Sequence, residues 1–424
     1  MTKHVVIVGA GFVGLNCAKS LGNVEGVRVT VLDRRNHHLF QPLLYQVAMA
    51  GLSPAEIAAP IRSILAPYRN VETLMTVVTA IDAERKVVTC DCGEITYDYL
   101  VVGAGAKHSY FGNERWEPFA PGLKTLSQAT EIRSRVLTAF EEAEKTKDAE
   151  RRRQLLTFVI VGGGPTGVEL AGAMGEMTRY TLTKEFRNID SRQTRVVLIE
   201  GGSRILAAFS PEHSAKATRT LEKLGVQVWT NCQVTDVTEE GVRAGNEFLR
   251  ASNVMWAAGV RANSLAAKAG WNVDRAGRAI VESDLSVPGF PHTFVAGDMA
   301  SVKDKKGNPV PGMAPGALQM GRYLGKLIRN ELNGKTRKPF QYWDKGMMAT
   351  IGRSQAVLES NGIKMSGFSA WIAWLVIHIY YLTGLRNRLF VVMSWTWSYM
   401  KFRRGARLIV RKDWQFWKDT ATSP

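Results

Sequence analysis

Short apolar runs alternate with stretches of helical periodicity along most of this chain. Residues 4–8 form a β-branched run, residues 15–21 a helix-forming stretch, and residues 27–32 a second apolar run. Continuous apolar runs of this length are typical of strands buried on both faces, and the spacing between them fits a crossover helix. The pattern therefore predicts a strand–helix–strand unit of an α/β fold at the start of the chain.

A glycine-rich loop joins the first strand to its helix. It reads Gly9-Ala10-Gly11-Phe12-Val13-Gly14, and Asp33 follows the second strand, 19 residues after the last of these glycines. The first glycine allows a tight turn, the second a close approach of a pyrophosphate, and the third close packing of helix on strand. Helix N-terminal N–H groups favour phosphate, and the acid accepts the ribose hydroxyls. The loop predicts dinucleotide binding.

A second complete unit follows about 150 residues later. A strand at 158–161 runs into Gly162-Gly163-Gly164-Pro165-Thr166-Gly167, a helix begins at 168–177, and a strand at 195–199 ends at Glu200. Two such units predict two dinucleotides on two related domains, one a flavin and one a nicotinamide. A carboxylate at the ribose position repels a 2′-phosphate, so we expect a preference for NADH over NADPH.

The intervening pattern predicts further elements. We expect a helix at 52–65 capped by Ser53, a strand at 71–80, a hairpin formed by 86–90 and 94–102, and a helix at 127–147 whose solvated end includes the basic run 151–153. Segments rich in small residues end two later strands, at 99–105 and 254–260, as expected where backbone passes close to a cofactor. Asp298 also follows a strand, and a helix begins near Ala314.

Charge and cysteine content narrow the class of protein. The net charge is +17, yet no zinc-knuckle spacing or basic recognition helix accompanies it, so we expect no nucleic-acid partner. The four cysteines do not form a disulfide framework, which indicates a reducing compartment. The start of the chain reads directly into a strand, and we expect no secretory signal.

Two motifs invite redox or metal chemistry. Cys90-Asp91-Cys92 falls at the predicted hairpin, but without a second pair we interpret these cysteines as structural. The adjacent His37 and His38 are interpreted as loop residues for the same reason. The segment after Asp33 lacks the Cys-x4-Cys pair of flavoprotein disulfide reductases, so the electrons must leave to an acceptor other than a disulfide.

The last part of the chain changes in composition. Residues 365–385 carry no charged side chain, and the densest apolar part, 368–382, is 15 residues, short of the roughly 20 that span a bilayer. Six of the eleven tryptophans lie in the last 59 residues, and residues 386–412 contain eight Lys or Arg and no acid. This pattern favours helices lying in the interface of an anionic membrane. A buried dimer interface with a solvated basic edge is the alternative.

Taken together, the chain resembles the type II, non-proton-pumping NADH:quinone oxidoreductases over residues 3–410. The resemblance rests on both fingerprints and on several further segments: residues 40–46, Thr166-Gly167-Val168-Glu169, Trp256-Ala257-Ala258-Gly259-Val260, Gly297-Asp298 and residues 346–352. It implies an α/β fold of two Rossmann-type domains, binding FAD and NADH, with a C-terminal amphipathic helical segment that associates with the membrane. It also implies oxidation of NADH and reduction of a membrane quinone (ubiquinone or menaquinone).

The resemblance also assigns residues. FAD is expected at Gly9, Ala10, Gly11, Phe12, Val13, Gly14, Asp33, Arg34, the backbone near Val78, Asp298, Ala314 and Pro315; NADH is expected at Gly163, Gly164, Thr166, Gly167, Glu200 and Gly259. Glu169 matches a glutamate implicated in coupling reduction to proton delivery, and Gln319 matches a glutamine beside the quinone. Two departures from the family pattern, Pro315 and Met320, remove polar groups expected near the quinone.

The resemblance further implies a domain order and a location. We expect an FAD-binding domain formed by 1–112 and 276–335, a linking helical segment at 113–156, an NADH-binding domain at 157–275, and a membrane and quinone region at 336–424. The expected place is the cytoplasmic side of the inner membrane, with a homodimer compatible with the apolar tail. The alternatives are a sulfide:quinone reductase, a soluble flavoprotein reductase and a non-enzymatic NADH-binding redox sensor.

Overall fold

The computed structural model describes residues 2–401 and 405–410. The chain forms two compact units, each built from separated segments. The first comprises Met1–Leu39, Ala58–Ser109 and Val260–Lys345; the second comprises Phe40–Ile57, Tyr110–Gly259 and Gly346–Pro424. The expected linking segment at 113–156 belongs to the second unit, where it forms two helices, α5 (Leu126–Lys145) and α6 (Ala149–Leu155).

A six-stranded sheet forms the centre of the first unit. Its order is β20-β21-β9-β1-β2-β5, with bounds β1 (Lys3–Val8), β2 (Val27–Asp33), β5 (Val71–Met75), β9 (Tyr99–Val102), β20 (Ser286–Val287) and β21 (Phe290–Val295). All neighbours are parallel except β20 and β21. Strands of a parallel sheet are covered on both faces, which explains why these runs are continuously apolar.

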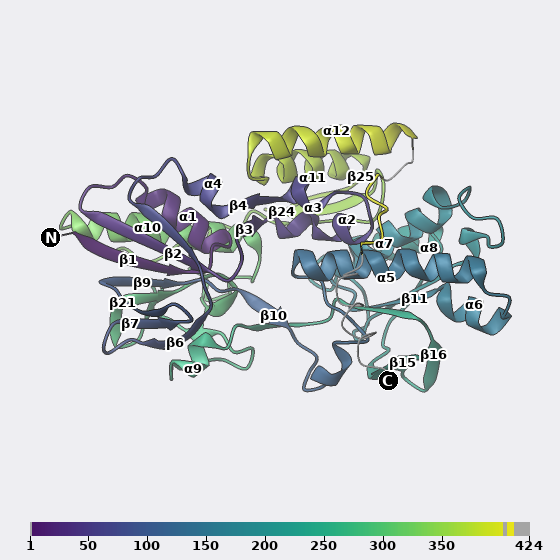
Figure 1. Cartoon of the computed structure of the whole chain (residues 1–424), viewed down its shortest axis with the longest axis horizontal. Helices are drawn as coiled ribbons and strands as arrows, with labels where there is room; N and C mark the ends of the chain where they lie inside the picture. Colours follow the sequence, from purple (N-terminus) through teal and green to yellow (C-terminus); the bar gives the residue numbers. More distant parts are fainter. Residues whose placement is uncertain (1, 402–404, 411–424) are drawn as a thin grey trace, which may run out of the picture. The chain divides into compact units, whose positions relative to one another are not determined.

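Two helices lie side by side against this sheet, α1 (Phe12–Leu21) and α10 (Ala314–Leu332) (Figure 1). Small residues allow the close approach. A Cβ at Gly321 would lie 2.3 Å from the Val13 carbonyl oxygen, and one at Gly325 would lie 2.4 Å from the Ser20 Cβ. The first unit therefore joins residues 1–39 and 260–345 in one core, as a split domain requires.

Smaller strands and helices complete the first unit. They are β3 (His37–Leu39), β4 (Ala58–Pro60), α4 (Ile61–Leu65), β6 (Val78–Asp82), β7 (Val87–Cys90), β8 (Gly93–Thr96), β10 (Ala106–His108), β18 (Val260–Ala262), α9 (Leu265–Lys268), β19 (Ala279–Ile280) and β22 (Ala300–Ser301). Strands β6, β7 and β8 form an antiparallel sheet, and Ile81 and Val88 from it join the main core.

Several element predictions were wrong in their extent. The helix expected at 52–65 is broken into α3 (Pro54–Ile57) and α4, because Ala58–Pro60 pairs with His37–Leu39 instead. The predicted cap is present, since the Ser53 N–H donates to the Glu56 carboxylate at 2.5 Å. The strand at 71–80 is two strands, the run at 94–102 divides into β8 and β9, and the basic residues 151–153 lie within α6.

The second unit contains the second βαβ unit. Its parallel sheet has the order β13-β12-β11-β17, with β11 (Thr157–Val161), β12 (Arg195–Ile199), β13 (Val226–Trp229) and β17 (Asn253–Trp256). Helices α7 (Pro165–Glu176) and α8 (Pro211–Lys223) follow β11 and β12, and β14 (Val234–Thr238), β15 (Gly241–Ala244) and β16 (Glu247–Arg250) form an antiparallel sheet. The short helix α2 (Leu44–Ala48) packs against both α5 and α7.

The last part of the chain adds a separate layer to the second unit. Strands β23 (Met347–Thr350), β24 (Ala356–Ser360) and β25 (Ile363–Gly367) form an antiparallel sheet, followed by α11 (Phe368–Tyr381) and α12 (Leu385–Lys401). The two helices run beside each other, with α3 nearby (Figure 1). Within the described ranges, no helix is both long and apolar enough to cross a membrane. Residues 402–404 and 411–424 of the predicted membrane region lie outside the described residues.

Candidate active site

The first glycine loop is formed as predicted. Gly9 has φ +94°, and a Cβ there would lie 2.5 Å from the Gly103 carbonyl oxygen, so only glycine fits this turn. A Cβ at Gly14 would lie 1.8 Å from the Gly9 oxygen. Around Gly11, at the N-terminus of α1, an ideal Cβ meets no atom within 4 Å. This open space beside free helix N–H groups fits a pyrophosphate.

Asp33 is fixed at the end of β2 by two backbone donors. The N–H of Ala10 donates to Asp33 Oδ2 at 2.7 Å, and that of Arg35 donates to Oδ1 at 2.8 Å. The carboxylate is thereby held beside the glycine loop, with lone pairs left for ribose hydroxyls. These residues fit the adenosine and pyrophosphate of FAD.

The other residues expected to bind FAD all lie in the first unit. Arg34 is exposed beside Asp33, and Val78 is the first residue of β6. Asp298 follows β21 in a short 3-10 turn, where Gly297 has φ +69° and a Cβ would lie 2.8 Å from the Val13 side chain. Ala314 and Pro315 form the first turn of α10. Proline is well tolerated there, because no intrahelical N–H bond is lost.

The second loop repeats this geometry in the second unit. Gly162 has φ +107°, and a Cβ at Gly167 would lie 1.8 Å from the Gly162 oxygen. Glu200 accepts from Gly163 N–H at 2.7 Å and from Gly202 N–H at 2.6 Å. Around Gly164, which precedes α7, an ideal Cβ again meets no atom within 4 Å. Thr166 is exposed in the first turn of α7. The loop fits the pyrophosphate and ribose of NADH.

Gly259 ends the small-residue segment of the second unit with φ +75°. A Cβ there would lie 2.7 Å from the ring of Phe111, which is itself 68% exposed. An exposed aromatic ring against a glycine turn was not foreseen from the sequence, because Phe111 lies 148 residues earlier and in no recognised motif.

Helix α7 connects the nucleotide loop to a pocket. Glu169, Ala173 and Glu176 lie on one face of α7, at the i, i+4 and i+7 spacing, and all three line the pocket. Its other walls come from α2, the β23 region, α11 and α12, and the pocket is partly open to solvent, with about 720 Å³ of empty space that includes part of the open solvent. The lining residues outside α7 are Tyr45, Gln46, Gly51, Thr350, Gly352, Arg353, Trp371, Trp374, Leu375, Trp395, Ser398 and Tyr399.

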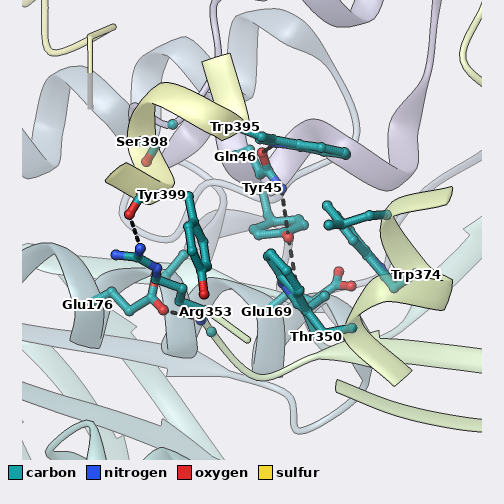
Figure 2. Close-up of a pocket in the computed structure, with 15 residues that line it drawn as sticks. Tyr45, Gln46, Glu169, Glu176, Thr350, Arg353, Trp374, Trp395, Ser398 and Tyr399 are labelled. Atoms are coloured by element: carbon teal, nitrogen blue, oxygen red, sulfur yellow. Dashed lines mark hydrogen bonds between the residues drawn. The ribbon is translucent and has the colours of Figure 1, made fainter. Parts of the chain in front are cut away.

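A row of hydrogen bonds runs along the pocket (Figure 2). Trp395 Nε1 donates to Gln46 Oε1 at 2.7 Å, Gln46 Nε2 donates to Tyr45 Oη at 3.0 Å, and Tyr45 Oη lies 3.1 Å from Thr350 Oγ1. A second row fixes Arg353, whose backbone N–H donates to Glu176 and whose side chain donates to the Tyr399 carbonyl. Segments far apart in the sequence are thereby held in one wall.

Glu169 lies at the base of this pocket. Burial raises the pKa of its carboxyl to about 8, and an interaction with the Thr350 backbone N–H opposes that shift. The approach of β23 to the helix depends on Gly172, where a Cβ would lie 2.9 Å from the Gly352 nitrogen. The carboxyl is therefore protonated at neutral pH and able to donate.

Trp374 brings an unused donor to the same pocket. The residue is 2% exposed, and its Nε1 has no hydrogen-bond acceptor among the described residues. Its ring stacks on His378 at 4.1 Å, and His378 Nδ1 lies 2.7 Å from the Trp374 carbonyl oxygen. A buried unpaired N–H costs free energy unless a partner satisfies it, and Trp374 is one of the residues that line this pocket.

Gln319 and Met320 lie on α10 in the first unit. The Gln319 amide is bonded at both ends to the Trp343 backbone, each at 2.9 Å. Met320 is 3% exposed, and its sulfur accepts from the Gly297 N–H at 3.1 Å. Met320 therefore packs within the core of the first unit. Its effect and that of Pro315 on a quinone site stay predictions.

Most of the pocket was missed in the sequence. Of the residues that line the pocket, the sequence assigns a catalytic role only to Glu169, whereas Tyr45 and Gln46 belong to a family segment without an assigned role. Trp374 and Trp395 belong to the tryptophan-rich tail, whose composition indicated a membrane interface. Their spacing gives no indication that Trp371, Trp374 and Trp395 line one pocket.

Comparison with known proteins now identifies the family. The family model of pyridine nucleotide-disulphide oxidoreductases matches residues 3–321, and that of the NDH2 C-terminal domain matches residues 344–404. The chain is similar to the type II NADH:quinone oxidoreductases Ndh and NdhA of Mycobacterium tuberculosis. Each is 43% identical, over 95% and 96% of this chain respectively and 89% of each relative.

A solved structure shows the same fold. It is that of NDH2 from Plasmodium falciparum in complex with RYL-552, with a TM-score of 0.87, 20% identity, and coverage of 97% of this chain and 100% of that one. The α/β fold predicted from the two fingerprints is confirmed by these matches. With both nucleotide loops in place and the relatives similar over nearly their whole length, the chain belongs to the type II NADH:quinone oxidoreductase family.

Proposed function

We propose that this flavoenzyme passes the two electrons of NADH to a quinone whose head group enters the pocket beside Glu169. The observation that carries the proposal is the arrangement on α7. The N-terminus of this helix forms the nucleotide loop, and its next turns carry Glu169 into a pocket that holds an unpaired indole donor. One rigid helix thus joins a nicotinamide site to a site for a carbonyl ligand.

Bound FAD supplies the chemistry of taking a hydride from NADH and releasing two electrons to a quinone. The chain's own residues bind and orient the partners. Asp33 and the loop from Gly9 to Gly14 hold the adenosine and pyrophosphate of FAD, while Glu200 and the loop from Gly163 to Gly167 hold those of NADH. Fixed geometry of this kind lowers the entropic cost of bringing the reactants together.

Glu169 holds one of the two protons that a reduced quinone requires. The pKa of about 8 keeps its carboxyl neutral at physiological pH. The carboxyl can therefore donate its proton to a quinone oxygen and be reprotonated from solvent. The Trp374 indole N–H stabilises the other developing negative charge by a hydrogen bond. The aromatic ring of Trp395 packs against the quinone ring.

Anaerobic stopped-flow measurement tests this assignment. In Trp374→Phe, we expect NADH to bleach the flavin band at the wild-type rate. We expect quinone to restore the band about tenfold more slowly, because the variant lacks roughly one hydrogen bond to the quinone. Trp371→Phe is the matched control, because it lines the same pocket and its ring stacks on Phe368 at 5.7 Å. An unchanged reoxidation rate in Trp374→Phe would place the quinone elsewhere.

The apolar face of α11 and α12 supports a second proposal, that these helices lie in the surface of an anionic membrane. Exposed apolar side chains recur every four residues on both helices. On α11 they are Phe368 (55%), Ile372 (41%), Val376 (63%) and Tyr380 (68%); on α12 they are Leu385 (72%), Leu389 (58%), Met393 (65%) and Trp397 (59%). Helical rows of this kind, beside basic residues such as Arg386, favour an interfacial position.

Binding of α11 and α12 to the membrane would place the pocket close to a quinone dissolved in the lipid. Helices α11 and α12 supply Trp374, Leu375, Trp395 and Ser398 to the pocket wall, so a quinone dissolved in lipid meets the protein at the helices that line its site. Since NADH is a cytoplasmic substrate, we place the protein on the cytoplasmic face of the inner membrane.

Vesicle sedimentation tests the membrane proposal. Leu389→Glu/Met393→Glu should release most of the protein from phosphatidylcholine vesicles containing phosphatidylglycerol. Ile280→Glu, an equally apolar and 48% exposed position in the first unit, should not. If the double variant instead turns a dimer into a monomer by light scattering, with vesicle binding unchanged, a second copy covers these rows.

A further inference from the structure

Two cysteines meet at the turn between β7 and β8 in the first unit. Cys90 ends β7 and pairs with Gly93, and Cys92 is the second residue of the turn. Their sulfur atoms lie 3.1 Å apart. Two residues apart in an extended strand would be separated by about 6.6 Å along the chain. The turn, which the sequence alone did not reveal as a thiol site, brings the two side chains into contact.

Neighbouring polar groups fix this turn. The buried Thr76 hydroxyl donates to the Asp91 carboxylate, and its oxygen lies 3.4 Å from Cys92 Sγ. The same carboxylate accepts from the Val77 N–H at 3.2 Å. Cys90 Sγ donates to the Gly93 carbonyl oxygen at 3.1 Å. The pair is thereby held at a set position on the β6–β7–β8 sheet.

The two thiols have opposite environments. Cys90 is 6% exposed, whereas Cys92 is exposed to solvent. Polar contacts of its sulfur with Thr76 and Cys90 lower the pKa of the Cys92 thiol, although the Asp91 carboxylate opposes this shift, while burial raises the pKa of the Cys90 thiol. An accessible sulfur with more thiolate character beside a buried partner is the arrangement of an attacking and a resolving thiol.

We propose that Cys90 and Cys92 form a reversible dithiol–disulfide site that reacts with hydroperoxides. The Cys92 thiolate attacks one oxygen of hydrogen peroxide: an S–O bond forms, the O–O bond breaks, and the released hydroxide takes up the proton that Cys92 lost on ionisation, giving water. The Cys90 sulfur then attacks Cys92, the S–S bond forms, the S–O bond breaks, and water leaves with the proton of Cys90. Two thiols and one peroxide thus give one disulfide and two waters, and a dithiol reductant reverses the change.

The closure requires only a small movement. The sulfur atoms must approach from 3.1 Å to about 2.05 Å, a shift that rotation of the exposed Cys92 side chain supplies. The turn has room to adjust, because an ideal Cβ at Gly93, where φ is +111°, meets no atom within 4 Å. The other two cysteines, Cys17 and Cys232, lie far along the sequence, and Cys17 is fully buried.

Thiol mapping of the full-length, FAD-loaded enzyme tests the proposal. The protein is reduced, desalted without oxygen, exposed to one to five equivalents of hydrogen peroxide, and alkylated. Cleavage after Lys86 and Lys107 gives a peptide that contains Cys90 and Cys92 and no other cysteine. We expect this peptide to be lighter by about 2 Da, unalkylated, and restored by dithiothreitol. The disulfide between Cys90 and Cys92 should form at least tenfold faster than Cys232 is oxidised, because Cys232 is a single thiol whose pKa is raised.

Single variants separate the two roles. In Cys90→Ser, Cys92 lacks its resolving thiol and should proceed to sulfinic acid, whereas in Cys92→Ser, Cys90 should remain reduced. The flavin absorbance of each variant shows that the fold is retained. Oxidation of Cys92 to sulfinic acid in the wild type, disulfide-linked dimers through Cys92, or reaction no faster than that of Cys232 would each overturn the proposal.

Discussion

The indole N–H of Trp395 donates to the side-chain carbonyl of Gln46 at 2.7 Å, across 349 residues of sequence. This bond fixes α12, a helix with an exposed apolar face, to α2, which packs against the nucleotide-binding helix α7. Gln46 in turn donates to Tyr45, and the Tyr45 hydroxyl is hydrogen-bonded to Thr350, whose backbone interacts with Glu169. The position of the tail therefore sets the orientation of polar groups in the proposed quinone pocket.

Removal of the hydrogen bond between Trp395 and Gln46 should weaken the reaction with quinone and leave the reaction with NADH unchanged. In Trp395→Phe the ring remains, but the Gln46 amide loses its donor and can rotate away from Tyr45. We expect the KM for quinone to rise about three- to tenfold, as for loss of one neutral hydrogen bond, with unchanged flavin bleaching by NADH. Steady-state and stopped-flow kinetics measure the two steps. Trp397→Phe, on the exposed side of α12, should leave both unchanged.

The proton carried by Glu169 predicts a pH dependence. Because the pKa of its carboxyl is about 8, the acid form prevails below that pH and is lost above it. Flavin reoxidation by quinone should therefore slow as pH rises through 8, and Glu169→Gln should be at least tenfold slower with a flat profile. Single-turnover rates from pH 6 to 10 test this. Glu176→Gln, on the same face of α7, should keep the wild-type slope; a sloping profile in Glu169→Gln would contradict the role.

The same carboxyl predicts a stability change with a defined sign. Its pKa rises from 4.5 when unfolded to about 8 when folded, so between these values the folded protein holds a proton that the unfolded chain releases. The free energy of unfolding therefore falls as pH rises through this window, by up to about 1.4 kcal/mol per pH unit from this group. Glu169→Gln removes that fall. Its Tm relative to wild type should increase from pH 5 to pH 8, as measured by thermal unfolding.

Glu200 predicts the choice of nicotinamide. Its carboxylate accepts two backbone N–H bonds and keeps a negative charge where a 2′-phosphate would lie. Glu200→Gln retains an acceptor but removes the charge, so the ratio of kcat/KM for NADH over NADPH should fall at least tenfold. Initial rates with both nucleotides measure it. A ratio that stays constant would show that another group rejects the phosphate.

Asp33 predicts retention of FAD. In Asp33→Asn, the amide cannot accept from both Ala10 and Arg35 and also bind the ribose. We expect the purified variant to lose more than half of its flavin after desalting, read as the ratio of flavin to protein absorbance. Asp98→Asn is the control, because Asp98 also accepts a backbone N–H, from His4, but at the other end of β1. Equal flavin contents would exclude a ribose role for Asp33.

Much of this protein follows from local sequence alone. Gly9 and Gly162 adopt positive φ and sit against backbone that no side chain could approach, so the two loops could be predicted from spacing without a structure. The acids Asp33 and Glu200 lie one strand further, where a βαβ unit of fixed length must place them. Short-range geometry of this kind depends only on residues close in sequence.

The pocket and the thiol pair were decided by tertiary structure. Tyr45, Glu169, Thr350 and Trp374 come from four separate segments, and each is ordinary in its own surroundings. The helix expected at 52–65 was interrupted because Ala58–Pro60 gained strand partners in His37–Leu39, a contact that helical periodicity does not encode. The sequence alone favours a structural interpretation of Cys90 and Cys92, whereas the folded turn places their sulfur atoms 3.1 Å apart. Local patterns fix turns and strands, whereas the pKa of Glu169 and the unpaired Trp374 N–H depend on burial by distant segments, which only the folded chain supplies.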